Sequence, residues 1–220
     1  MTRALRFYRS TIGKKTAMGV TGLIWVGFVV GHMTGNLLVL QGREEINAYS
    51  RFLKSTGELL WVARAVLAGA LVLHVAAAVQ LTVQNRAARP VGYARRDPQV
   101  STFASRTMRW GGALLLIFIV IHILHFTTGT LRPAGSFSVT DVYANVVSSF
   151  RIWWVAGFYI VSMFALGLHL YHGVWSSVRS LGLARPSGDP LRRRVALVLA
   201  AVVWLGFTIV PVAILAGWVG

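Results

Sequence analysis

The chain has 220 residues, of which 55% are hydrophobic and only 13% are charged, a composition that excludes an ordinary soluble domain and places the chain in a lipid bilayer. It carries a formal net charge of +16, which we attribute to basic loops that face anionic lipid and an acidic partner, not to nucleic acid binding. It has no cysteine, which excludes disulfides, thiolate-bound iron–sulfur clusters and covalently attached haem within it.

Five apolar runs follow one another along the chain, near residues 16–40, 59–84, 109–130, 152–178 and 195–219. Each reaches the roughly 20 residues that a helix needs to cross about 30 Å of hydrocarbon. The first run follows a basic segment but is too long for a signal peptide and ends without a small-x-small cleavage site, so we expect it to remain as a span. The sequence therefore predicts an all-α membrane protein with five transmembrane helices in a single domain, residues 1–220.

Lysine and arginine are distributed unequally between the two sides of these spans. Most of the 22 basic residues precede the first span or lie in the second and fourth connections. Because basic loops stay in the cytoplasm, this distribution predicts a cytoplasmic N-terminus and an outer C-terminus. We expect a multi-pass protein of the cell membrane.

All six histidines of the chain lie inside predicted spans. A polar side chain at that depth is costly unless it is buried with a partner. A hydrogen bond to a neighbouring helix, worth about 1 kcal/mol or less, would explain one such residue, but six in four spans suggest a shared task. They are His32, His74, His122, His125, His169 and His172.

The depths of four of these histidines fall into two levels. At about 1.5 Å per residue, His32 and His122 lie roughly 14–15 Å below the outer edge of their spans, and His74 and His169 roughly 24–27 Å below it. Counted from the inner edge, the order is the same and the gap shrinks from about 11 Å to about 6 Å. Two facing histidines at each of two levels is the arrangement that holds two haems inside a four-helix bundle. The haems would be b-type, and the fifth helix, which has no histidine, would pack against the bundle.

Several neighbouring residues are candidates for contacts to the edge of such a cofactor. His125 and His172 each stand three residues beyond a ligand candidate, where they could bind a haem propionate or a quinone, or be the ligand instead. Arg64 could bind the same groups or could be an interfacial residue whose side chain extends outward. Gly31, next to His32, would let a flat macrocycle or another helix approach closely.

Four stretches carry a resemblance to a known family: LIWVGFVVGHMTGN, LVLHVAAAVQLTVQN, LLLIFIVIH and FYIVSMFALGLHLYHGVW. In order and spacing, from about residue 10 to 215, the chain resembles the five-helix, di-haem cytochrome b subunit of the b558 type. In many bacteria this subunit anchors succinate dehydrogenase or fumarate reductase, the succinate:quinone oxidoreductases, in the cell membrane. It is the membrane subunit of the enzyme complex and carries no catalytic residue of the succinate reaction.

The resemblance implies a role for each paired histidine. His32 and His122 would ligate the distal haem, and His74 and His169 the proximal haem, which is the pairing that the depth count gives independently. A flavoprotein and an iron–sulfur subunit would dock on the cytoplasmic face, and electrons from succinate would pass through two haem b groups to a quinone, with menaquinone as the expected one. The quinone contacts and the oligomeric state of the complex stay open.

The chain departs from some fumarate-reducing relatives at one position. Those relatives carry a glutamate two residues before the ligand in the fourth span, where it is linked to proton movement across the membrane. Here that position is Gly167, and the fourth span contains no carboxylate. We therefore do not expect this chain to use that proton route.

Two other readings of the histidines remain. The H-x-x-H spacing in HILH and HLYH also occurs in membrane di-iron enzymes, and intramembrane histidines can serve metal transport. Both alternatives require the histidines to cluster at one level, whereas the depth count separates HILH from HLYH. A cytochrome b that anchors a formate dehydrogenase or a hydrogenase would share the two-level arrangement, and the four stretches favour the succinate complex over it.

Overall fold

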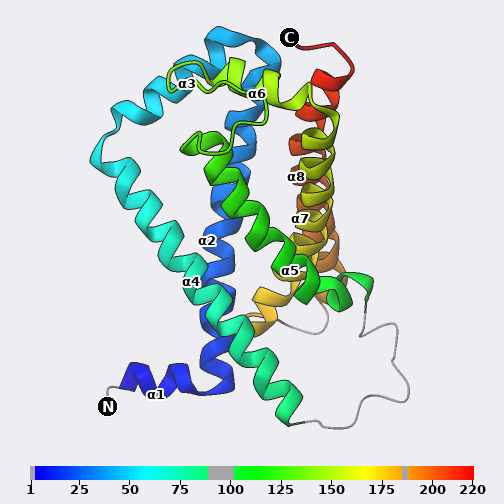
Figure 1. Ribbon diagram of the computed structural model, residues 1–220. Coiled ribbons are helices and arrows are strands. Elements are labelled where there is room, and N and C mark those ends of the chain that lie inside the picture. Colours follow the sequence, from blue (N-terminus) through cyan, green and yellow to red (C-terminus); the bar gives the residue numbers. More distant parts are fainter. Residues whose placement is uncertain (1–2, 89–101, 185–187) are drawn as a thin grey trace.

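The computed structural model describes residues 3–88, 102–184 and 188–220, of which 84% are helical and none lie in strands. The helical elements follow in chain order (Figure 1): α1 Arg3–Arg9, α2 Thr11–Leu37, the 3-10 helix η1 Leu38–Gln41, α3 Arg43–Ser55, α4 Glu58–Ala87, α5 Phe103–His122, the π-helical η2 Ile123–Thr127, α6 Val142–Phe150, α7 Trp153–Ser180 and α8 Asp189–Leu215.

Five of the described helical segments are long and apolar enough to cross a membrane, which confirms the predicted all-α fold and the five spans. They are Thr11–Gln41, Glu58–Ala87, Phe103–Thr127, Trp153–Ser180 and Asp189–Leu215.

Three spans begin five or six residues before their apolar runs, at Thr11, Phe103 and Asp189, and in the last two the local sequence favours a helix start. The Thr102 side chain accepts a hydrogen bond from the Ser105 backbone N–H, so α5 begins at Phe103, as expected for a threonine N-cap. Pro190 stands in the first turn of α8, where its fixed φ suits the start of a helix. The polar residues that follow each cap are therefore helical as well.

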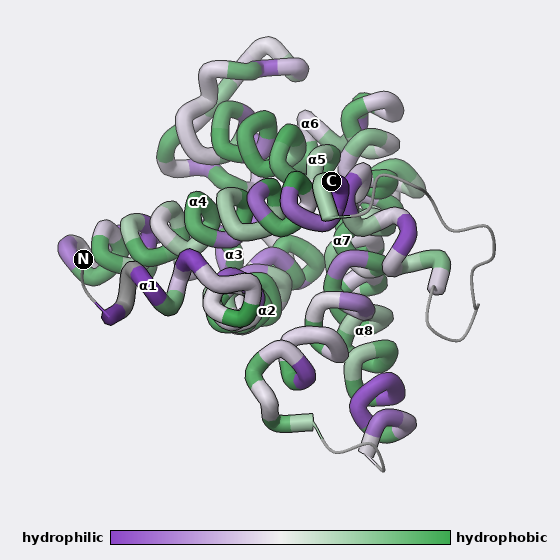
Figure 2. The backbone as a smooth tube through the Cα atoms, turned by 90° about the horizontal axis from the view of Figure 1, so that it is seen from below, coloured by the Kyte–Doolittle hydropathy of each residue, from purple (hydrophilic) through white to green (hydrophobic). Residues whose placement is uncertain are grey.

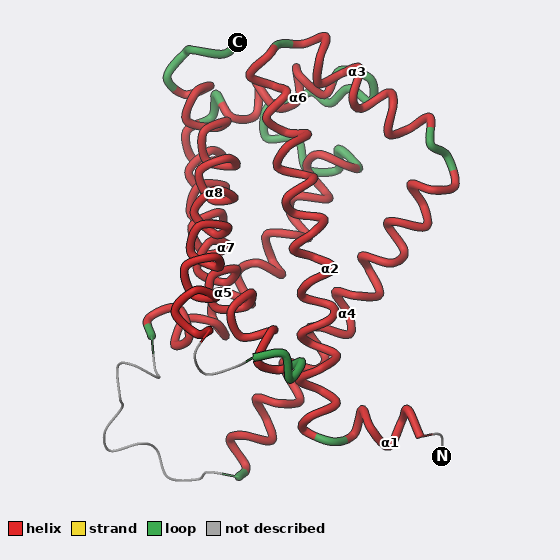
Figure 3. The backbone as a smooth tube through the Cα atoms, turned by 180° about the vertical axis from the view of Figure 1, so that it is seen from behind, coloured by secondary structure: helices red, strands yellow, loops and turns green. Residues whose placement is uncertain are grey.

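Helix α2 occupies the middle of the bundle. It packs against α4, α7 and α8, while α7 also packs against α5 and, most extensively, against α8. Figures 1 and 3 show α7 and α8 side by side on one side of α2, with the part of α4 nearest α3 leaning away on the other side. Among the described helices, α2 is the only one with which α4 has an extensive contact.

The side-chain distribution is that of a protein in lipid. Trp110, Trp153 and Trp218 are among the most exposed side chains, at 82%, 77% and 77%, and exposed tryptophans are typical of the membrane interface. Contacts between helices use small residues, since Ala77 and Ala156 are completely buried. Coloured by hydropathy, the long helices are mostly hydrophobic, while α1 carries hydrophilic residues (Figure 2).

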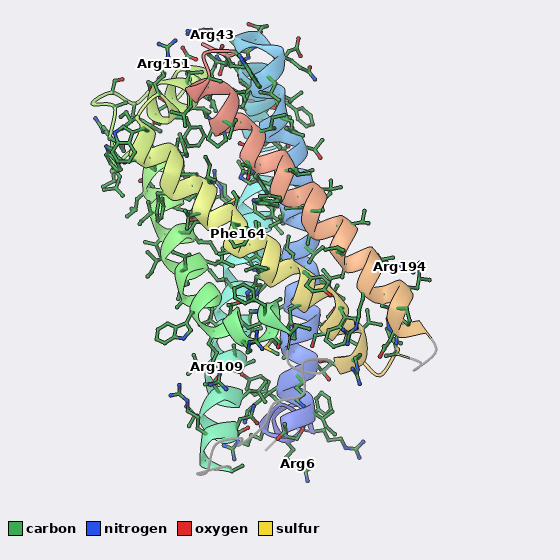
Figure 4. All side chains as sticks on the ribbon, turned by 90° about the vertical axis from the view of Figure 1, so that its right-hand side faces the viewer. Arg6, Arg43, Arg109, Arg151, Phe164 and Arg194 are labelled. Carbon is green, nitrogen blue, oxygen red and sulfur yellow. The ribbon has the colours of Figure 1, made fainter. Side chains whose placement is uncertain are left out.

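The two ends of the bundle differ. The N-terminus and α1 lie at one end, which we call the α1 end, and the C-terminus lies with α3 and α6 at the opposite end, the α3–α6 end (Figure 1). Figure 4 shows Arg43 and Arg151 at the α3–α6 end, Arg6 and Arg109 toward the α1 end, and Phe164 of α7 between them. The end of α4, the start of α5, the end of α7 and the start of α8 also lie toward the α1 end (Figure 1).

Helices α3 and α6 are elements that the sequence analysis missed, and Asp141 joins them. Its carboxylate caps α6 by accepting a hydrogen bond from the Ala144 N–H at 3.1 Å. It also accepts one from Asn47 Nδ2 of α3 at 3.0 Å and pairs with Arg43. Asn47 Oδ1 in turn accepts a hydrogen bond from the Tyr143 N–H at 3.1 Å. These contacts fasten the two short helices to each other.

We expect Asp141→Ala to lower the free energy of unfolding at neutral pH by about 1–2 kcal/mol, because α6 loses its N-cap and Asn47 its acceptor. The hydrogen bond from Asn47 is the largest cause that holds the pKa of Asp141 below its ordinary 3.8, with the Ala144 N–H and the Arg43 charge acting the same way against partial burial. A lowered pKa means that the stabilisation is complete above pH 3.8 and disappears as the pH falls through the lower, folded-state value.

Unfolding of the detergent-solubilised protein, followed by circular dichroism from neutral to acidic pH, measures this difference. Glu44→Ala is the matched control, because Glu44 forms an exposed ion pair with Arg51 on α3 itself, which contributes little. Two results would contradict the role of Asp141: an equal loss of unfolding free energy in both variants, or a difference between the two variants that does not shrink at acidic pH.

Candidate metal-binding sites

The structure brings four of the six histidines together as two pairs. His32 of α2 faces His122 at the end of α5, with ring centroids 5.8 Å apart and ring planes at 78°. His74 of α4 faces His169 of α7, with centroids 6.2 Å apart and planes at 52°. These are the pairs that the depth count predicts. We call them the α2–α5 pair and the α4–α7 pair.

The two pairs lie at different levels of the bundle. Thr21 of α2 contacts His74, and it precedes His32 on the same helix by about three turns, or roughly 16 Å. On α5, a Cβ added to Gly112 would lie 3.8 Å from His169 Cε1, and Gly112 precedes His122 by roughly 15 Å. The separation is thus larger than the sequence count of about 6–11 Å, because that count depends on span ends that composition locates poorly.

Aromatic side chains surround the α2–α5 pair. The His32 ring stacks on Phe28 with centroids 5.2 Å apart and lies 5.9 Å from Phe207. The His122 ring stacks on Phe118 at 5.6 Å and meets the ring of Tyr159 at 6.1 Å. The two imidazoles of this pair are thus packed among aromatic rings.

Thr21 orients the His74 ring. The Thr21 hydroxyl donates to the Ala17 carbonyl at 2.7 Å, so it is the acceptor in its 3.1 Å contact with His74 Nδ1. The proton of His74 is then on Nδ1, and the lone pair on Nε2 is available to a metal, which is the arrangement commonly found behind metal-binding histidines. Sequence analysis missed Thr21. The available signal was its position on the same face of the helix as His32.

Two ring nitrogens in these pairs lack partners. Within the described part of the chain, His122 Nδ1 and His169 Nδ1 are buried and have no hydrogen-bond partner. A buried polar atom without a partner costs about 1–3 kcal/mol. One imidazole of each pair therefore has unused bonding capacity in the interior of the bundle.

The geometry of both pairs fits a bis-imidazole metal centre. Two ring nitrogens on opposite sides of one ion, each about 2 Å from it, place the ring centroids roughly 6 Å apart. The observed separations, 5.8 and 6.2 Å, are close to this value. Beside His32, Gly27 and Gly31 are exposed, and a Cβ added to either would meet no atom within 4 Å. The centroid separations therefore fit a bis-imidazole metal centre at each level.

His125 lies apart from both pairs. It is 4% exposed, and its Nδ1 and Nε2 form hydrogen bonds with Tyr159 Oη at 3.0 Å and Ser149 Oγ at 2.9 Å. Both ring nitrogens are thus engaged by protein. Of the two histidines of HILH, His122 is the one that faces a partner imidazole.

The remaining predicted site residues lie at the edges of the bundle. His172 is half-buried, with its ring 5.8 Å from that of Trp175. Arg64 is exposed, and its guanidinium lies 4.9 Å from the centroid of the Trp61 ring, as expected for an interfacial residue. The structure thus favours the interfacial reading of Arg64 over a cofactor contact.

The histidines do not gather as a di-iron or transport site would require. In residues 3–88, 102–184 and 188–220, which include all six histidines, no three histidine, aspartate or glutamate side chains come together. No protein-family model, curated protein or solved structure matches the chain. The paired histidines and the sequence resemblance are therefore the basis for a functional proposal.

We expect Thr21→Val to lower the free energy of unfolding by about 1 kcal/mol, because it removes the hydroxyl that contacts His74 Nδ1 and leaves the Met18 carbonyl as the remaining partner of the ring. The variant should also shift the ¹⁵N resonances of the His74 ring. Thr21→Ser, which keeps the hydroxyl, is the control and should resemble the wild type. Identical His74 ring resonances in all three proteins would show that Thr21 does not orient the ring.

Proposed function

We propose that the chain is the di-haem cytochrome b membrane anchor of a succinate:quinone oxidoreductase, in which it connects a partner iron–sulfur subunit to a quinone. The observation that carries this proposal is the presence of two facing imidazole pairs at two levels of one helical bundle. When bound, two haem b groups supply one-electron carriers at these levels. The sequence resemblance supports this function and indicates menaquinone as the quinone.

The four imidazoles define what such a site does. His32 and His122 would hold one haem between them, and His74 and His169 the other, so that protein imidazoles would take up the coordination capacity that oxygen needs. This favours electron transfer over gas binding. Because the chain has no cysteine, the paired histidines and the surrounding packing are what this chain offers to retain a porphyrin.

The remaining parts of each site serve binding and orientation. Phe28 and Phe118 support the rings of the α2–α5 pair, and Thr21 holds the proton of His74 on Nδ1. Phe207 and Tyr159 complete the aromatic surroundings of the α2–α5 pair. These residues are the contribution of the chain to holding two haems.

The distribution of charge supports the location of the partner subunits. The α1 end carries Arg3, Arg6 and Arg9, together with Arg106 and Arg109 at the start of α5. By the positive-inside rule this end faces the cytoplasm of a bacterial cell. It is accordingly the end at which the flavoprotein and iron–sulfur subunits dock in this proposal.

We expect the purified protein to show a reduced-minus-oxidised spectrum of about two b haems per chain. His32→Ala and His122→Ala should lose one and the same haem, and His74→Ala and His169→Ala the other, because each haem requires both of its ligands. Phe164→Ala, a change at an exposed residue of α7, should retain both. Zinc or non-haem iron in place of haem, with no Soret band, would exclude the proposal.

The identity of the complex is tested separately by isolating the chain with its native partners. We expect a flavoprotein and an iron–sulfur subunit to co-purify and to reduce a menaquinone analogue with succinate. The His32→Ala complex should still oxidise succinate with a soluble dye but should fail to reduce the quinone analogue. Co-purification with a formate dehydrogenase or a hydrogenase would instead assign a di-haem anchor of a different enzyme.

A further inference from the structure

The α5 span ends in a wider helical turn directly after His122. The Thr128 N–H donates to the Ile123 carbonyl at 3.0 Å, an i→i+5 bond that defines the π-helical turn η2. Such turns are rare and are frequent at functional sites. In a regular α-helix, residues three apart lie on nearly the same face. The wide turn permits His122 and His125 to take different directions.

The two histidines of HILH do take different directions. His122 faces His32 across the bundle, whereas His125 is hydrogen-bonded to Ser149 of α6 and Tyr159 of α7. The ring of His125 also stacks on Phe126 at 4.0 Å. We call Ser149, His125 and Tyr159 the His125 clamp. It ties η2 to two helices that lie later in the chain.

The His125 clamp and His122 share one side chain. The Tyr159 hydroxyl holds His125, and the ring of Tyr159 lies edge-on to His122 at 6.1 Å and to Phe118 at 5.2 Å. A neutral imidazole has one donor and one acceptor nitrogen, and the two hydroxyls of the clamp satisfy both. His125 therefore has no lone pair for a metal while the clamp is closed.

The HLYH stretch has the same H-x-x-H spacing as HILH but a different local structure. Helix α7 continues as a regular α-helix through His169 and His172 to Ser180. His172 is half-buried against Trp175, and no wide turn follows His169. The two H-x-x-H pairs are therefore different structures, and only the pair in α5 and η2 is associated with a clamp.

We propose that His125 is a positioning residue: the His125 clamp holds the π turn in place and thereby directs the His122 ring toward His32. The clamp is a property of the chain, and its effect on a haem at the α2–α5 pair rests on the proposed function. His125 acts through Tyr159 and the helix end, and it touches neither a metal nor a substrate.

Two single-atom changes test the clamp while keeping the rings in place. Tyr159→Phe removes the hydroxyl that holds His125 and keeps the ring that packs on His122, and Ser149→Ala removes the other hydroxyl. Tyr171→Phe, on the same helix, is the control for the first. Ser148→Ala is the control for the second, because the Ser148 hydroxyl bonds to the Ala144 carbonyl within α6.

We expect Tyr159→Phe and Ser149→Ala each to shift the low-spin electron paramagnetic resonance signal and the midpoint potential of one haem. The affected haem should be the one that is lost in His32→Ala. The haem that is lost in His74→Ala should be unaffected. The control variants should leave both signals in place. In haem-free protein, the ¹⁵N resonances of the His122 ring should shift in the two clamp variants and stay unchanged in the controls.

The outcomes separate this inference from the proposed function. Unchanged His122 resonances in the double variant Ser149→Ala/Tyr159→Phe would overturn the inference whether or not the protein binds haem. A haem retained in His122→Ala and lost in His125→Ala would also overturn it, because His125 would then be the ligand. A wild-type protein without haem would exclude the proposed function, and the ring resonances would still decide the inference.

Discussion

An imidazole inside the hydrocarbon of a membrane must satisfy its ring nitrogens without water, and this constraint shapes the bundle. His74 meets it with a threonine hydroxyl and the Met18 carbonyl, and His125 with two hydroxyls. His122 and His169 each keep a buried nitrogen with no partner among the described residues, and each faces a second imidazole. Since an unsatisfied polar group in this setting is costly, these two nitrogens mark where the bundle has bonding capacity that the described residues do not use.

Close contacts between helices, together with hydrogen bonds at one end of the bundle, hold the helices around these histidines in place. In lipid, burial of apolar surface does not drive helices together as it does in water, so small residues and polar contacts matter more. Completely buried Ala77, Ala156 and Ala196 let helices approach closely. Beyond the ends of the spans, Asp141 joins α3 to α6, so segments far apart in the sequence close the α3–α6 end of the bundle.

The sequence was sufficient to predict the five spans and the partners of the paired histidines, because both follow from hydropathy and helical rise, which are local properties. It did not indicate α3, which is polar, or α6, which is apolar but only nine residues long, and both are set by the contact of Asn47 with Asp141. Thr21, Ser149 and Tyr159 were missed because their roles depend on helices that meet only in the folded chain. The wide turn after His122 has no sequence signature, and it separates two histidines that a regular helix would align.

Helix α2 reaches both levels, through Thr21 and His32. The segment between them spans about three whole turns, so both residues point toward the interior. Insertion or deletion of one residue there would rotate one end by about 100° relative to the other, which would turn either the threonine or the histidine toward lipid. The length of this stretch is therefore as constrained as the identity of its histidine, and its tolerance to substitution should exceed its tolerance to any change in register.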